Sequence, residues 1–343
     1  MRQLLLLLVI ISVVFAEYDP LQDNLELGRF DDLYTQAKQE VFTSENARSY
    51  YYLGQAYAGQ GRLALAENSF VQVFKYPYEA SYGIGIAEYY EKQKNEIQAA
   101  ATYARVLSDF PTANDAAERL GQMYFNQNKY QQTIDVCTRL VNEDPGKANP
   151  LGYYIGTSYF VLGDTSKALE YYDLAQAKGY VDPEMTLKIG YIKVKNGDTR
   201  AGVELMAKGI TAVQKQQPMY MYTTLAEAYA RLNQFDLAAS AYKKALQSGN
   251  QPVQVYINYA SNAAQGKNFR GIVDTLEPKV DQFEKSGDFL YYLASAYDNL
   301  GSKTQAATFY QKALDAGYQN KAFIKGRINA ISNVNADTSD EEQ

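Results

Sequence analysis

Residues 47–80 read ARSYYYLGQAYAGQGRLALAENSFVQVFKYPYEA, and this stretch holds the pattern that decides the fold. Its first half carries apolar or small residues three or four positions apart, the spacing of one helix face: Tyr50, Leu53, Gly54 and Tyr57. Its second half repeats that spacing on a second face: Ala66, Phe70 and Val73. Gly59-Gln60-Gly61 separates the two halves, and Pro77 cannot continue a helix. The stretch therefore predicts two short amphipathic helices joined by a tight turn.

The same context returns along most of the chain. A small residue recurs at intervals of 33 to 36 residues: Gly54, Ala87, Gly121, Gly156, Gly190, Ala226, Ala260 and Ala294. An aromatic residue follows three positions later in six of these eight places: Tyr57, Tyr90, Tyr124, Tyr159, Tyr229 and Tyr297. A fixed period of about 34 residues is typical of helix–turn–helix repeats, whose pairs bury their apolar faces only by stacking on neighbours.

These units resemble the tetratricopeptide repeat, which carries Leu-Gly, Tyr, Ala, an aromatic residue, Ala and Pro at fixed places. Segment 287–320 matches at Leu293-Ala294, Tyr297, Gly301, Ala306, Tyr310 and Ala313. Segments 80–113, 183–216 and 253–283 match less well, and the last has Ala263 and Ile272 in place of Tyr and Ala. The resemblance implies an all-α fold, a right-handed superhelical solenoid of about eight helix–turn–helix units over residues 47–320.

Both ends of the array depart from the repeat. Residues 17–46 are predicted to form a degenerate N-terminal repeat or cap, with an irregular stretch at 17–24 and a second helix from Leu27 to Val41. At the other end, residues 321–333 are expected to form an amphipathic capping helix with Phe323, Ile324 and Ile328 on one face. Residues 334–343 are polar and acidic, a composition that predicts disorder.

The first 16 residues have the features of a secretory signal peptide. Arg2 is followed by an apolar stretch from Leu4 to Phe15, and Ala16 is a suitable residue before a cleavage site at Glu17. A membrane anchor is the alternative, but the stretch is shorter than the roughly 20 residues that a spanning helix needs. We therefore expect cleavage, no later membrane insertion and an extracytoplasmic location. The bacterial periplasm is favoured over secretion or the endoplasmic reticulum lumen.

Composition excludes several classes of function. The chain has no histidine, which rules out histidine-based acid–base catalysis, Ser-His-Asp triads and histidine-ligated zinc. The formal net charge is −6 and no basic stripe stands out, so nucleic acid is not an expected partner. The single cysteine, Cys137, is expected to be a buried and inert apolar residue. Asp31-Asp32 reads as a helix start, and no motif predicts a metal, a cofactor or an enzyme.

The resemblance also implies a concave groove lined by the first helix of each repeat, in which the residue one after the helix start and those at its fifth, ninth and twelfth places face inward. At these places the chain has mostly tyrosine, amide, hydroxyl and carboxylate side chains. The predicted groove residues are Tyr51, Gln55, Glu88, Glu118, Gln122, Phe125, Tyr153, Thr157, Phe160, Tyr191, Tyr220, Thr223, Glu227, Ile257, Ser261, Tyr291, Ser295 and Asp298. The matched Lys and Asn residues of repeats that grip acidic C-terminal tails do not occur there. Tyrosine with short polar neighbours favours an extended peptide or a helix as the ligand, although the same residues can simply solvate the face.

The leading hypothesis is an exported, non-enzymatic scaffold or adaptor that binds protein or peptide partners through this groove in a multiprotein assembly. A chaperone or carrier for unfolded or secreting polypeptides is the alternative, because the groove is rich in tyrosine and weakly charged. A third hypothesis is the recruiting subunit of an enzyme formed by another chain. A homo-oligomer is compatible with each of them.

Overall fold

A computed structural model describes residues 19–213, 215–249 and 251–340. The predicted signal peptide at residues 1–16 lies outside these ranges. Two compact units divide the chain between Lys178 and Gly179, here called unit 1 and unit 2. No helix within the described ranges is both long and apolar enough to cross a membrane.

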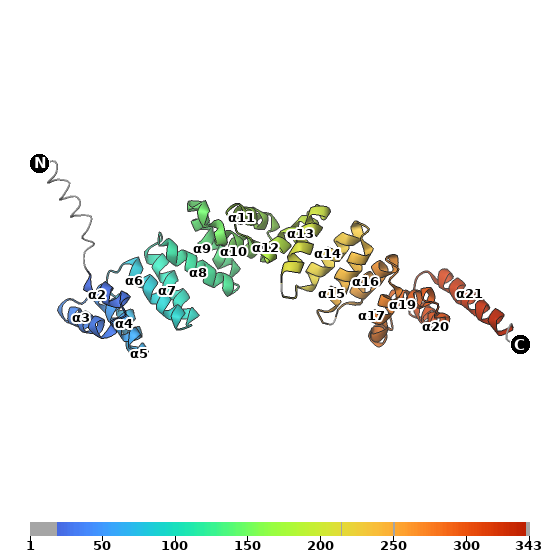
Figure 1. Ribbon diagram of the computed structural model, residues 1–343, viewed down its shortest axis with the longest axis horizontal. Helices are drawn as coiled ribbons and strands as arrows, with labels where there is room; N and C mark the ends of the chain where they lie inside the picture. The colour runs from blue at the N-terminus through green and yellow to red at the C-terminus, as the bar shows by residue number, and fades with distance from the viewer. Residues whose placement is uncertain (1–18, 214, 250, 341–343) are drawn as a thin grey trace. The chain divides into compact units, whose positions relative to one another are not determined.

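Both units consist of α-helices that follow one another in antiparallel pairs (Figure 1). The helices of unit 1 are α2 (Pro20–Glu26), α3 (Phe30–Thr43), α4 (Ala47–Gly59), α5 (Leu63–Val73), α6 (Ala80–Lys92), α7 (Glu96–Asp109), α8 (Asn114–Asn126), α9 (Tyr130–Glu143), the 3₁₀ turn η1 (Pro145–Lys147), α10 (Ala148–Val161) and α11 (Thr165–Ala177). Those of unit 2 are α12 (Pro183–Lys195), α13 (Thr199–Ala212), α14 (Met219–Arg231), α15 (Phe235–Leu246), α16 (Val253–Gln265), α17 (Phe269–Leu276), η2 (Glu277–Lys279), α18 (Val280–Phe283), α19 (Gly287–Asn299), α20 (Lys303–Asp315) and α21 (Lys321–Asp340).

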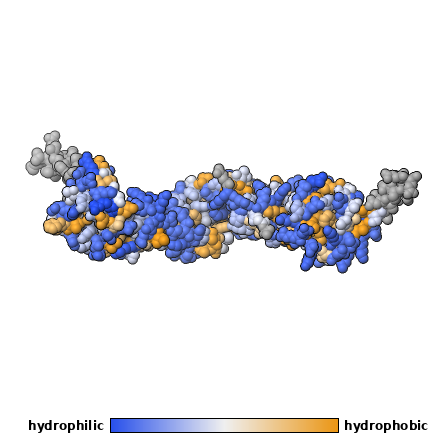
Figure 2. Space-filling model, turned by 90° about the horizontal axis from the view of Figure 1, so that it is seen from below, coloured by the Kyte–Doolittle hydropathy of each residue, from blue (hydrophilic) through white to orange (hydrophobic). Residues whose placement is uncertain are grey.

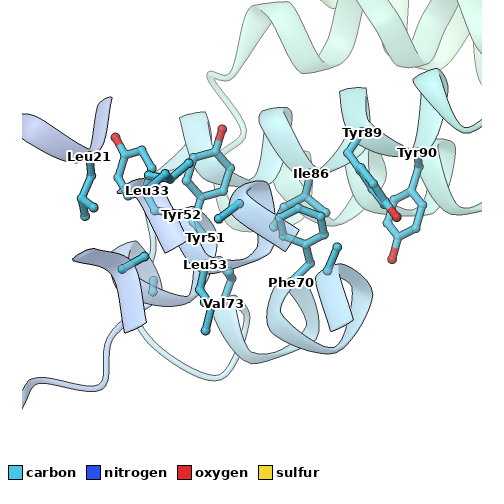
Figure 3. Close-up of a cluster of buried hydrophobic side chains, with 14 of the residues drawn as sticks. Leu21, Leu33, Tyr51, Tyr52, Leu53, Phe70, Val73, Ile86, Tyr89 and Tyr90 are labelled. Carbon is cyan, nitrogen blue, oxygen red and sulfur yellow. The ribbon is translucent and has the colours of Figure 1, made fainter. Parts of the chain in front are cut away.

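The predicted close approach of the second helix to the small residue of the first helix is seen at Gly54 and Gly156. In α10, a Cβ added to Gly156 would lie 2.6 Å from the ring of Tyr172 on α11, so only glycine admits the ring there. The equivalent neighbour of Gly54 is Phe70, which packs between α4 and α6 in the core of unit 1 (Figure 3). The ring of Phe70 lies 5.0 Å from the ring of Tyr89, so the second helix of one repeat also contacts the first helix of the next. At this contact the core of one repeat continues into the next.

The N-terminal segment is more regular than predicted. Pro20–Glu26 forms α2 instead of an irregular stretch, because Asp19 caps the helix by accepting from the backbone N–H of Leu21 at 2.9 Å, and Pro20 suits the first helical position. Arg48 on α4 then donates to Asp19 at 2.7 Å and to Glu40 on α3 at 2.5 Å. These ion pairs join α2, α3 and α4, so α2 and α3 form a helix pair ahead of the array.

The weakly matching segment 253–283 is irregular. Its second helix, α17, ends at Leu276, and Pro278 begins a turn that leads into the short α18. Proline removes a backbone donor and obstructs the preceding turn, which accounts for the break. Phe283 on α18 still packs on Tyr256 and Phe289, with ring centroids 5.2 and 5.3 Å apart. This repeat therefore keeps its aromatic core although its second helix is divided.

The last helix, α21, occupies the place of the first helix of a ninth repeat, since Lys321 lies 34 residues after Gly287. At the two positions where other repeats have a large apolar residue followed by a small one, such as Leu293-Ala294, α21 has Arg327 and Ile328. An isoleucine at the small position leaves no space for a second helix to approach closely. The helix runs to Asp340, beyond the predicted end at 333, and neither glycine nor proline occurs after Gly326 to stop it.

Candidate functional site

The first helices of the repeats form what we call the first-helix face, and contacts join α2 to α4, α4 to α6, α8 to α10, α12 to α14 and α16 to α19. In unit 1 the face comprises α2, α4, α6, α8 and α10, and in unit 2 it comprises α12, α14, α16 and α19. A hollow of about 450 Å³ opens on this face in unit 1, between α4 and α6, with the α2–α3 corner at one end. Among the residues that line it are Leu25, Phe30, Tyr51, Gln55, Glu88 and Tyr89. Three of the predicted groove residues, Tyr51, Gln55 and Glu88, thus meet in one cavity.

The wall of this α4–α6 hollow depends on a tyrosine and a glycine. The ring of Tyr51 stacks on Tyr82 of α6, with centroids 4.8 Å apart and planes at 27°. A Cβ at Gly85 would lie 3.0 Å from Cε2 of Tyr51 and nearer still to its hydroxyl, so the ring lies directly over the α6 backbone. Burial raises the pKa of Tyr51, and the carboxylate of Glu88 raises it further. Tyr51 therefore stays a neutral hydrogen-bonding group within the physiological pH range.

The remaining lining combines amide and charged groups with apolar walls. Gln55 and Glu88 are half-buried and occupy the same repeat position on neighbouring helices. Lys92 lines the hollow one turn after Glu88 on α6 and is exposed. Leu25 and Phe30 close the end of the hollow with apolar surface. The hollow thus mixes apolar walls with several converging polar groups, which are the groups that give ligand sites their specificity.

The other predicted residues of unit 1 are divided between the surface and the core. Gln122 is exposed, and Glu118 accepts from Lys147 at 2.7 Å. Phe125 stacks on Tyr154 with ring centroids 4.6 Å apart. Tyr153 is only 8% exposed, and Phe160 is half-buried. Thr157 is buried, and its hydroxyl shares a hydrogen bond of 3.1 Å with the hydroxyl of Tyr172, so it points into its own repeat instead of toward a partner.

In unit 2, two predicted tyrosines, the half-buried Tyr191 and the exposed Tyr220, form a ring pair. The rings of Tyr191 on α12 and Tyr220 on α14 lie 5.5 Å apart at 79°, and Tyr220 is 42% exposed. Thr223 and Glu227 follow Tyr220 on the same face of α14, and Glu227 is exposed. The half-buried residues of this face include Ile257, Ser261, Tyr291 and Ser295.

Asp298 departs from the prediction because it is withdrawn from the face. Its side chain is 3% exposed and accepts from Lys303 at 2.7 Å and from Nε of Arg327 at 2.9 Å. These two cations, through hydrogen bonds, hold the pKa of Asp298 below its ordinary value although burial opposes them. The repeat pattern does not predict this role, since Arg327 lies in the capping helix and not in the repeat that contains Asp298.

Cys137 has the predicted character. It is fully buried under Gly121, and burial raises the pKa of its thiol to about 12. No group of three or more Cys, Asp or Glu side chains within the described ranges is arranged to hold a metal ion. The view in Figure 2 shows a mostly hydrophilic surface with hydrophobic residues in separate small patches. Sequence reasoning missed Tyr82, Gly85 and the apolar end of the hollow, because these depend on how α4 meets α6 and α2.

Helix pairs that recur about every 34 residues and a shared face of first helices define an all-α helical-repeat solenoid, a class of interaction scaffold. Sequence profiles of the tetratricopeptide repeat family match residues 85–148, 47–77, 220–248 and 288–316. These four segments are identified as tetratricopeptide repeats. The chain is accordingly a protein-interaction scaffold for protein or peptide partners.

Similarity to solved structures is one of fold. The structure of Naa15/Naa10 bound to HypK-THB has a TM-score of 0.51 at 14% identity, with an alignment over 90% of this chain and 59% of that one. A tetratricopeptide repeat protein from Parabacteroides merdae has a TM-score of 0.40 at 15% identity, over 74% of this chain and 98% of that one. YrrB, described as a TPR protein with an unusual peptide-binding site, has a TM-score of 0.43 at 15% identity, over 54% and 93%. No curated protein sequence matches the chain.

Proposed function

We propose that the chain is an exported, non-enzymatic adaptor that holds a peptide segment of a partner protein on its first-helix face, with the α4–α6 hollow as the main anchor site. One observation carries the proposal. Tyr51, Gln55 and Glu88 come from two helices and line one hollow of about 450 Å³. A volume of this size lies within the range of ligand pockets and accommodates one large side chain with its flanking backbone.

The chemistry of the hollow fits an extended peptide. Amide side chains such as Gln55 both donate and accept hydrogen bonds, and the Glu88 carboxylate accepts from backbone N–H groups. Leu25, Phe30 and the ring of Tyr51 provide the apolar contact that an anchoring side chain requires. The predicted signal peptide supports export, and the composition, without histidine, supports a role other than catalysis.

Selection from a displayed library of random peptides tests the binding site. The affinity of selected peptides is measured by titration calorimetry on the wild-type chain and on Gln55→Leu and Glu88→Ala. We expect each variant to weaken binding at least fivefold, the equivalent of about 1 kcal/mol. The matched control is Gln132→Leu, since Gln132 is an exposed glutamine on the second helix α9. Equal affinity for all four chains would refute the hollow as the anchor.

Two further measurements test the wider proposal. Expression of the full chain in a Gram-negative host, followed by mass spectrometry of the osmotic-shock fraction, should find a chain that begins at Glu17. An uncleaved chain in the cytoplasm would refute export. In a separate assay the chain should not suppress aggregation of unrelated unfolded proteins at stoichiometric ratios, and strong suppression would favour a chaperone instead.

A further inference from the structure

A second group of residues on the first-helix face, in unit 2, has a different chemistry from the α4–α6 hollow. Tyr191 lies at its centre. Its ring lies 5.5 Å from that of Tyr220 and nearly perpendicular to it, so the two rings form the walls of a corner. Tyr220, Thr223 and Glu227 are three and four residues apart on α14 and therefore share one helix face. We call these residues the Tyr220–Glu227 corner.

The corner carries an uncompensated negative charge. Glu227 is exposed, and among the described residues no lysine or arginine nitrogen lies within 4.0 Å of its carboxylate. Arg231, four residues later on α14, is also exposed and forms no ion pair with it. By contrast, two other carboxylates of unit 2 are paired, since Glu184 binds Lys188 and Lys215, and Asp298 binds Lys303 and Arg327. Glu227 is close enough to Tyr191 to raise its pKa, although burial is the larger cause.

The rings of the corner attract cations. The ammonium of Lys195 lies 5.6 Å from the centroid of the Tyr191 ring, within the distance of a cation–π interaction. Lys195 is exposed and belongs to the same helix as Tyr191. The ring of Tyr220, which is 42% exposed, offers a second aromatic surface beside it. A ring pair next to an unpaired carboxylate is the combination that recognises ammonium and guanidinium groups.

We propose that the Tyr220–Glu227 corner binds a basic side chain, arginine or lysine, of the partner protein. The guanidinium or ammonium lies against the Tyr220 ring and donates to the Glu227 carboxylate. This inference rests on the proposed function, in which the first-helix face takes up a partner segment. It adds that the segment carries a positive charge, as complementarity to Glu227 requires.

Ligand-detected NMR on the full chain at low ionic strength tests the corner directly. The probe is acetyl-arginine-amide, and the matched neutral probe is acetyl-citrulline-amide, which has nearly the same shape without the charge. We expect the arginine probe to bind two- to fivefold more tightly than the citrulline probe, the size expected for exposed cation–π and ion-pair contacts. Glu227→Gln should abolish this difference and Tyr220→Ala should reduce it. Tyr220→Phe, which keeps the ring, should retain it.

Two controls separate the corner from general charge attraction. Glu204→Gln removes the same charge at an exposed position on the second helix α13, and it should preserve the preference for arginine. Lys195→Gln removes a competing cation and should strengthen arginine binding. Equal binding of the two probes to the wild-type chain would overturn the inference, as would an equal loss in Glu204→Gln and Glu227→Gln. Because the probes do not require the α4–α6 hollow, either result leaves the peptide titrations with Gln55→Leu and Glu88→Ala as a separate test of the proposed function.

Discussion

Replacement of Gly190 by alanine tests the close contact between α12 and α13. A Cβ at Gly190 would lie 2.6 Å from the backbone nitrogen of Met206 and 2.8 Å from the carbonyl oxygen of Gly202. Ordinary contacts of a Cβ begin at 3.4 Å, so the two helices must separate by about 0.6 to 0.8 Å. Because both obstructing atoms belong to the backbone, no change of rotamer can relieve the contact.

Two opposing terms set the expected size of the effect. Overpacking of a well-packed contact costs about 1–3 kcal/mol. Alanine in place of glycine inside a helix raises the free energy of unfolding by about 0.5–1 kcal/mol. We therefore expect Gly190→Ala to lower the free energy of unfolding by roughly 1–2 kcal/mol. Gly326→Ala is the matched control, because no atom lies within 4 Å of the Cβ that it would add to α21. This variant should be neutral or slightly stabilising.

Urea unfolding followed by circular dichroism measures the overall change, and amide hydrogen exchange locates it. Repeat arrays do not always unfold in a single step, so the exchange rates of α12 and α13 are the decisive measurement. Gly190→Ala should accelerate exchange in these two helices, and Gly326→Ala should not. If Gly190→Ala exchanges as slowly as the wild-type chain, the role of Gly190 as a spacer between the helices is refuted.

Three more predictions concern single side chains. Asp298→Asn should lower the unfolding free energy by about 1.5–3 kcal/mol, the range for hydrogen bonds to charged groups, and accelerate exchange in α21. Since the pKa of Asp298 is below its unfolded value of 3.8, its contribution is complete above roughly pH 5 and declines as the pH falls further, which acid titration of wild type and Asp298→Asn should show. Cys137, with a pKa of about 12, should not react with a disulfide reagent at neutral pH until urea unfolds the chain. Tyr89→Phe removes a buried hydroxyl that has no hydrogen-bond partner among the described residues, so urea unfolding should show equal or higher stability, and a loss above about 1 kcal/mol would refute this.

The fold could be predicted because its decisive contacts lie within single repeats. Gly156 and Tyr172 are 16 residues apart, as are Gly54 and Phe70, and one period of the sequence contains both partners. The repeat therefore displays the same contact several times, and each copy supports the others. Helix ends follow from equally local signals, such as the cap at Asp19, which was nevertheless overlooked because the segment lies outside the periodic part.

The candidate site could be predicted only in part, because it depends on contacts between repeats. Tyr51, Gln55 and Glu88 were predicted from their repeat positions, but their convergence depends on Gly85, which the repeat pattern does not single out. Thr157 and Asp298 occupy repeat positions that are expected to face the groove. Thr157 is instead bound by Tyr172 of its own repeat, and Asp298 is bound by Arg327 of the capping helix. The position of a residue in the repeat predicts the direction of its side chain. Whether that side chain is free to contact a partner protein depends on neighbouring residues, which the repeat pattern does not predict.

Specificity for a partner must therefore come from positions at which the repeats differ. The positions that the repeats share serve mainly to pack one helix on another, so they are not available to distinguish ligands. Gly85 stands where equivalent first helices have Tyr52, Tyr154 and Tyr292, and the absence of a side chain there lets the Tyr51 ring lie across α6 beside the hollow. If this reasoning holds, Gly85→Ala should displace Tyr51 and weaken peptide binding in unit 1, while the arginine preference of the Tyr220–Glu227 corner stays unchanged. Loss of both would mean that the substitution disturbs the fold and not the site.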